Sequence, residues 1–237
     1  MTDRPMDRLA RRAFLLAAGA APAAALPLSA APAADSAAAI PAAEGPPPAL
    51  LVLNDAEAAF LAAAADTMVP ADDLSPSGSA LGVVTYIDGQ LASAWGGGDR
   101  AYRAGPHPPG TPEQGSQIPL APRDLLLAGL AEAEAWCRAT YGKSLDALSL
   151  PQKNEALARM ESGTAQFAGL SSAAFFNLLL DLTMEGVFAD PIYGGNRGMA
   201  GWKMLGFPGL PATYADKIAR YQTRRYEAPP RSIADFL

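Results

Sequence analysis

The stretch LSSAAFFNLLLDLTMEGVFAD, residues 170–190, decides the expected fold because it predicts the most apolar helix of the chain. A serine ahead of the run is a suitable N-cap, and Pro191 directly after it ends the helix. Apolar side chains lie nearly all round this predicted helix, as expected for a helix in the centre of a domain. They are Phe175, Phe176, Leu179, Leu180, Leu182 and Met184.

Helical patterns also dominate the rest of the chain after residue 50. Asn54 and Glu57 have the spacing of a capping box, Pro122 suits a first helical turn, and Gly142 suits a helix C-terminus. No alternating strand pattern exceeds four residues. We therefore predict an all-α fold, an irregular helical domain with long ordered loops. The other predicted helices span 54–70, 80–95, 122–141, a shorter segment from about 151, and 214–225.

The first 34 residues are typical of a bacterial export signal, with a positive region, an alanine-rich apolar segment and small residues that suit cleavage. The pair Arg11 and Arg12, followed by Ala-Phe-Leu, resembles the twin-arginine signal. A Sec-type signal with a chance arginine pair is the alternative. The predicted segments are a twin-arginine signal peptide over 1–34, an Ala/Pro-rich linker over 35–49, a helical domain over 50–227 and a C-terminal tail over 228–237.

Composition limits the chemistry that the chain could carry. Its formal net charge is −6, and we place basic clustering only at the extreme N-terminus, so we expect no nucleic-acid partner. The sequence has one histidine, His107, and one cysteine, Cys137, too few for a Cys/His zinc site. We expect Cys137 to be a packed side chain, with a reactive or intermolecular thiol as the alternative.

The segment DPIYGGNRGMAGWKMLGFPG, Asp190–Gly209, holds six glycines but no His, Cys, Ser or Thr. We expect Gly194, Gly195 and Asn196 to form a tight turn with positive φ angles. Gly198 and Gly201 should permit close backbone approach. The segment is thus expected to have a specified shape and little reactive chemistry.

Several side chains of this segment are of the types that anchor protein interfaces: Tyr193, Arg197, Met199, Trp202 and Phe207. The alternative is that they hold the segment to its own domain, because Trp is usually mostly buried. Both are compatible, with Trp202 facing inward and Tyr193 and Arg197 facing outward. We expect the long irregular segment 96–122 to lie beside this surface.

Two carboxylates on the apolar helix, Asp181 and Glu185, are four residues apart and share a face. They are candidates for an acid/base pair or half of a metal site, and the alternative is an ordinary polar stripe. Asp66, Asp72 and Asp73 flank the turn at Pro70 but lack the spacing of a calcium loop. We therefore expect neither a metal nor a catalytic set in this chain.

Three segments together resemble the gluconate 2-dehydrogenase small subunit family, also called subunit 3 or gamma. They are Asp190–Gly209, the run WGGGDRAYRAGPHPPGTPEQG and the run AADTMVPADDLSPSGSALGVVTYID. The resemblance covers about 51–221. Seven residues match the family signature and are our candidates for partner binding, with Arg197 added from its chemistry: Asp190, Tyr193, Gly194, Gly195, Asn196, Gly201 and Trp202.

The resemblance implies a non-catalytic subunit that assists maturation and twin-arginine export of a large flavoprotein of the glucose-methanol-choline type. FAD would belong to that partner, haem c to a cytochrome c subunit present in many such complexes, and no cofactor to this chain. The complex would be periplasmic and associated with the inner membrane. The rival is a stand-alone exported enzyme or sugar-binding protein that uses Asp181, Glu185, His107 or Tyr193 in a cleft between 96–122 and 190–209.

Overall fold

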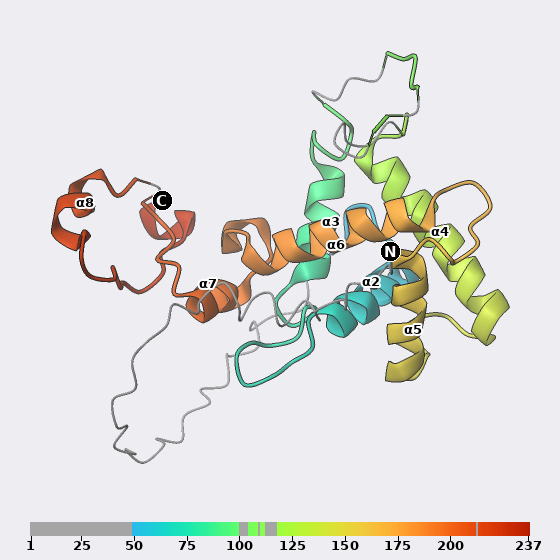
Figure 1. Cartoon of the computed structure of the whole chain (residues 1–237), viewed down its shortest axis with the longest axis horizontal. Coiled ribbons are helices and arrows are strands. Elements are labelled where there is room, and N and C mark those ends of the chain that lie inside the picture. Colours follow the sequence, from blue (N-terminus) through green and yellow to red (C-terminus); the bar gives the residue numbers. More distant parts are fainter. Residues whose placement is uncertain (1–48, 100–103, 109, 112–117, 212) are drawn as a thin grey trace, which may run out of the picture. The chain divides into compact units, whose positions relative to one another are not determined.

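The computed structural model describes residues 49–99, 104–108, 110–111, 118–211 and 213–237. Within these residues the chain is helical and has no strand, which confirms the all-α prediction (Figure 1). The predicted signal peptide, with Arg11 and Arg12, lies outside the described residues, as does the linker up to Pro48. The α-helices are α2 (Asp55–Met68), α3 (Val83–Ala92), α4 (Pro122–Tyr141), α5 (Leu150–Glu161), α6 (Ser172–Phe188), α7 (Ala200–Leu205) and α8 (Ala215–Tyr221). Short 3-10 helices are η2 (Pro191–Tyr193), η3 (Arg197–Met199) and η4 (Ile233–Phe236).

Helix α6, orange in Figure 1, is central to the packing, as its apolar run predicts. It contacts α3, α4, α5 and α7, and Phe175, Leu179 and Leu182 are almost completely buried. The prediction of apolar side chains nearly all round was too strong. Asn177, Asp181 and Glu185 form an exposed line at a spacing of four, so α6 keeps one polar stripe toward solvent.

Local capping signals placed several helix ends correctly. The Asn54 side chain accepts from the backbone of Ala56 and Glu57, and Glu57 completes the capping box. Gly142 ends α4 with φ 73°. Helix α3 is shorter than predicted, because Gly82 at its N-terminus has φ 87° and is not helical. A cap of this kind depends only on neighbours in the sequence.

A buried carboxylate holds the first residues of the folded domain. Asp88 on α3 is 4% exposed, and its side chain accepts backbone hydrogen bonds from Leu51, Val52 and Leu53 at 2.7, 2.9 and 2.9 Å. Three donors satisfy a carboxylate that would otherwise be costly to bury. Residues 51–53 are therefore held against α3 by Asp88, which lies 35 to 37 positions further along the chain.

Cys137 is fully buried on α4. Burial, and then the nearby Glu134 carboxylate, raise the pKa of its thiol to about 12. Because the thiolate is the reactive form of cysteine, a thiol with a raised pKa is unreactive at neutral pH. The packed side chain expected from the sequence is therefore what the structure shows.

Candidate functional site

The segment Asp190–Gly209 begins where α6 ends and turns back on that helix. Asp190 caps η2 by accepting a hydrogen bond from Ile192 N at 3.0 Å, and Gly194 follows with φ 90°. Asn196 is completely buried and has φ 44°, as expected for the turn. Its side chain donates to Ala189 O at 2.9 Å and accepts from Gly201 N at 2.8 Å. Asn196 therefore closes the segment onto itself with its own amide.

Gly195 is required for a different reason than the sequence indicates. We expected a positive φ there, and that expectation is wrong, because Gly195 is not among the residues with positive φ. A Cβ added at Gly195 would instead lie 2.2 Å from Gly186 O on α6. Gly201 is similar, since its Cβ would lie 2.4 Å from Val187 O. Both glycines let the segment pack against the backbone of α6.

Trp202 faces inward, as predicted. Its indole nitrogen donates to Phe188 O at 2.7 Å, and the residue is only 7% exposed. Phe207 packs edge-on against the indole at a ring distance of 5.3 Å. The indole thus satisfies a carbonyl at the C-terminal end of α6 and packs on Phe207 near the end of the segment.

Arg197 does not face outward as expected. Its backbone nitrogen donates to Leu81 O at 3.0 Å, and its guanidinium donates to Thr85 Oγ1 at 3.2 Å. The half-buried side chain lies over Gly82, where an added Cβ would be 2.8 Å from Arg197 Nε. Arg197 therefore fastens the turn to the N-terminal end of α3.

The outward face of the segment is mainly apolar. Tyr193 is 55% exposed, in agreement with its predicted orientation, and Ile192 is 45% exposed. Leu205 and Phe207 are also exposed. Beside them Tyr86 donates to Glu185 Oε2 at 3.1 Å, and burial together with this carboxylate raises the pKa of Tyr86.

Asp190 also holds the C-terminal residues, which the sequence led us to set apart as a tail. Its carboxylate accepts from Ser232 Oγ at 2.7 Å and from Ile233 N at 2.8 Å, and Gly209 pairs with Arg231 in an isolated bridge. Burial alone would raise the pKa of Asp190, but hydrogen bonds from Ile192, Ser232 and Ile233 outweigh burial and hold the pKa below its ordinary value.

Segments 96–122 and 190–209 are anchored at opposite ends of α3. Arg123 donates from its backbone to Gly96 O and from Nε to Leu91 O, so the long segment starts and finishes at the C-terminal end of α3. The turn that contains Arg197 packs at the N-terminal end, about 15 Å away for a ten-residue helix. The two ends of the long segment therefore do not lie beside the Arg197 turn, and the expectation for the rest of it falls partly on residues 100–103, 109 and 112–117, outside the described residues.

The candidate acid/base residues are not brought together into a site by these contacts. Asp181 and Glu185 belong to the exposed stripe of α6, and His107 is half-buried in the long segment. Asp66 accepts from Ser79 N and Oγ, so it supports a turn. Within the described residues no group of three or more His, Cys, Asp or Glu could hold a metal ion, and no helix is long and apolar enough to span a membrane.

Residues 55–209 match the family described as gluconate 2-dehydrogenase subunit 3. The chain belongs to this family. It is accordingly a subunit of a dehydrogenase complex that has other subunits. No curated protein and no solved structure gives a significant match to the chain.

The match to the subunit 3 family ends at Gly209, so the Asp190–Gly209 segment closes the family region. Three features of this region escaped the sequence analysis: the Asp88 clamp, the inward Arg197 and the bond from Asp190 to the C-terminus. Only Asp88 left a signal, because a lone Asp stood on the apolar face that includes Leu81, Ile87 and Leu91. A lone carboxylate in such a pattern indicates a buried acceptor.

Proposed function

We propose that this chain is a non-catalytic subunit of a flavin-dependent sugar or sugar-acid dehydrogenase complex. It binds a large flavoprotein of the glucose-methanol-choline type, which holds FAD, and assists that partner's maturation and twin-arginine export. The complex is periplasmic, is associated with the inner membrane, and passes electrons through a cytochrome c subunit with haem c. Family membership supports the role of subunit. The more specific assignments are ours.

One observation carries the proposal for the binding surface. Three polar side chains of Asp190–Gly209, those of Asp190, Asn196 and Trp202, are engaged in hydrogen bonds within the chain. Ile192 and Tyr193 nevertheless stay about half exposed. Exposed aromatic and aliphatic side chains on a rigid support are typical anchors of a protein interface, because little entropy is lost when they are covered.

The experiment is co-purification of the flavoprotein with tagged variants of this chain, with flavin absorbance measured on the eluate. Tyr193→Ala should weaken the complex by roughly 1–3 kcal/mol if Tyr193 is a central anchor. Leu150→Ala is the matched control, since Leu150 is an exposed apolar residue at the start of α5. Arg197→Ala is not a clean interface test, because Arg197 also fastens the turn to α3.

Two results would count against this surface. One is recovery of flavoprotein by Tyr193→Ala and by the double variant Ile192→Ser/Tyr193→Ala at the level of the unmodified chain. The other is stoichiometric flavin on the purified chain without any partner, which would place the cofactor in this chain.

A further inference from the structure

The C-terminal segment differs in charge from the family region that precedes it. Residues 55–209 carry nine basic and seventeen acidic side chains, a net charge of −8, whereas residues 210–237 carry five basic and three acidic ones, a net charge of +2. The five basic residues lie within 217–231, which corrects our expectation that basic residues cluster only at the N-terminus. This segment also contains three of the seven tyrosines.

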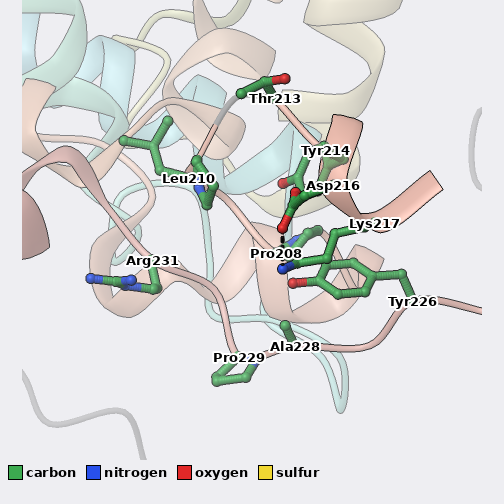
Figure 2. A pocket seen from close by; sticks show the side chains of 11 residues that line it. Pro208, Leu210, Thr213, Tyr214, Asp216, Lys217, Tyr226, Ala228, Pro229 and Arg231 are labelled. Atoms are coloured by element: carbon green, nitrogen blue, oxygen red, sulfur yellow. Dashed lines mark hydrogen bonds and ion pairs between the residues drawn. The ribbon is translucent and has the colours of Figure 1, made fainter. Parts of the chain in front are cut away.

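Tyrosines line two adjoining hollows in this segment: Tyr214 and Tyr226 line both, and Tyr221 lines the second. The rings of Tyr214 and Tyr221 each pack edge-on against Tyr226, at 5.7 and 4.9 Å, and Tyr214 is fixed by a 2.7 Å hydrogen bond to Gly209 O. One hollow, of about 220 Å³, is also lined by prolines, Lys217 and Arg231 (Figure 2). The other, of about 280 Å³, shares Tyr214, Lys217 and Tyr226 with it and adds Ile218.

The second hollow is lined mainly by aromatic and aliphatic side chains, and two arginines stack on one of its tyrosines. Helix α8 has no buried residue, and Ile218 is 64% exposed. The guanidinium groups of Arg220 and Arg224 lie over the ring of Tyr221, at 5.8 and 4.7 Å. Among the described residues neither arginine has a carboxylate at ion-pair distance. A guanidinium that stacks on a ring still presents its N–H groups at the edge, where they can bind a carboxylate in bidentate fashion.

We propose that residues 214–226 form a second docking surface, which binds an acidic segment of a partner chain. A protruding apolar side chain of that segment enters the hollow of Tyr214, Ile218 and Tyr221, and carboxylates on either side of it pair with Arg220 and Arg224. The side chains of this surface do not include any residue of Asp190–Gly209, so the proposal does not depend on the one made for the flavoprotein.

The shape of the site favours a peptide over an anionic lipid surface. Peripheral proteins bind lipid with apolar side chains that protrude from the protein into the headgroup region. Here only Ile218 is largely exposed, whereas the half-buried tyrosines line an open hollow and pack on one another. A concave apolar site with few polar groups fits a protruding side chain, and the surrounding charge selects acidic neighbours.

The test is a selection of random displayed peptides on the immobilised, purified chain, followed by anisotropy with a fluorescent copy of the consensus peptide. We expect sequences with one large apolar residue flanked by Asp or Glu. Binding should weaken about tenfold in Arg220→Glu/Arg224→Glu and should fall as salt is added. Ile218→Ser should weaken binding without a change in net charge.

The matched control is Lys143→Glu/Lys153→Glu, which makes the same charge change in the turn after α4 and on α5 and should bind like the unmodified chain. Circular dichroism checks that each variant is folded, which we expect since α8 buries nothing. A consensus without acidic residues would overturn the proposal. Equal binding by the arginine variant, or by a peptide with glycine in place of the apolar residue, would do the same. Binding to phosphatidylglycerol vesicles without any peptide consensus would assign the surface to lipid instead.

Discussion

Asp190 and Ser232 are 42 residues apart, and their side chains share a 2.7 Å hydrogen bond that joins the end of α6 to the C-terminus of the chain. Asp190 therefore serves two elements, since it also caps η2 through Ile192 N. A carboxylate that accepts several hydrogen bonds is stabilised in its charged form.

This geometry predicts a pH dependence of stability. The pKa of Asp190 in the folded chain lies below its ordinary value of 3.8. The stabilisation is therefore fully present above the unfolded value and is lost as the pH falls through the folded value. We expect the melting temperature, followed by circular dichroism, to fall in that acid range less steeply for Asp190→Asn than for the unmodified chain. Identical pH profiles would contradict the role given to Asp190.

Trp202 and Tyr193 should differ in what they contribute. Trp202→Ala removes a 7% exposed side chain and its bond to Phe188 O, so we expect a loss of about 3–5 kcal/mol in the free energy of unfolding. Tyr193→Ala removes an exposed side chain, and the change should stay within about 0.5 kcal/mol. Urea denaturation of the two variants measures both. A stability loss of similar size in each would show that Tyr193 is also an internal anchor.

Two glycines test the effect of adding a Cβ. At Gly195 there is no space for it, and at Gly89 there is. Gly195→Ala places a Cβ 2.2 Å from Gly186 O, so we expect a loss of about 1–3 kcal/mol from overpacking. Gly89→Ala in α3 has nothing within 4 Å of its Cβ and should stabilise the helix by about 0.5–1 kcal/mol. Thermal melts of the two variants measure these opposite changes in stability. A neutral Gly195→Ala would mean that the turn moves away from α6 at no cost.

The hydrogen bonds to Asp88 should keep residues 51–53, at the start of the folded domain, in an ordered conformation. Asp88→Ala leaves the amides of Leu51, Val52 and Leu53 without their acceptor. The Leu53 bond is the buried one, and an unsatisfied buried group costs about 1–3 kcal/mol. Hydrogen exchange at these three amides should become faster in the variant, whereas exchange in the middle of α4 should change much less. Unchanged protection at residues 51–53 would show that another acceptor holds them.

Export should depend on the arginine pair. Replacement of Arg11 and Arg12 by Lys keeps the charge but removes the guanidinium groups, and a twin-arginine signal is read through that pair. We expect the variant to remain in the cytoplasm and the partner's dehydrogenase activity to disappear from the periplasm. Fractionation and immunoblotting measure both. Normal export of the double variant would identify a Sec-type signal.

Local signals in the sequence were enough for the helices and for several of their ends. The capping box of Asn54 and Glu57, the C-terminal Gly142 of α4 and the apolar run of α6 were all predicted. Each depends on residues within a few positions of one another, where backbone geometry alone decides which groups meet. The positive φ of Asn196 belongs to the same class.

Tertiary structure alone decided which residues of the candidate site face inward. Gly195 is required by Gly186 O, Arg197 by Thr85, and Asp190 by Ser232. The last two pairs are 112 and 42 residues apart. A sequence shows that a residue can donate, accept or leave space. Its partner is chosen only when the helices pack, because buried polar groups must then find acceptors and donors in whatever segment lies against them.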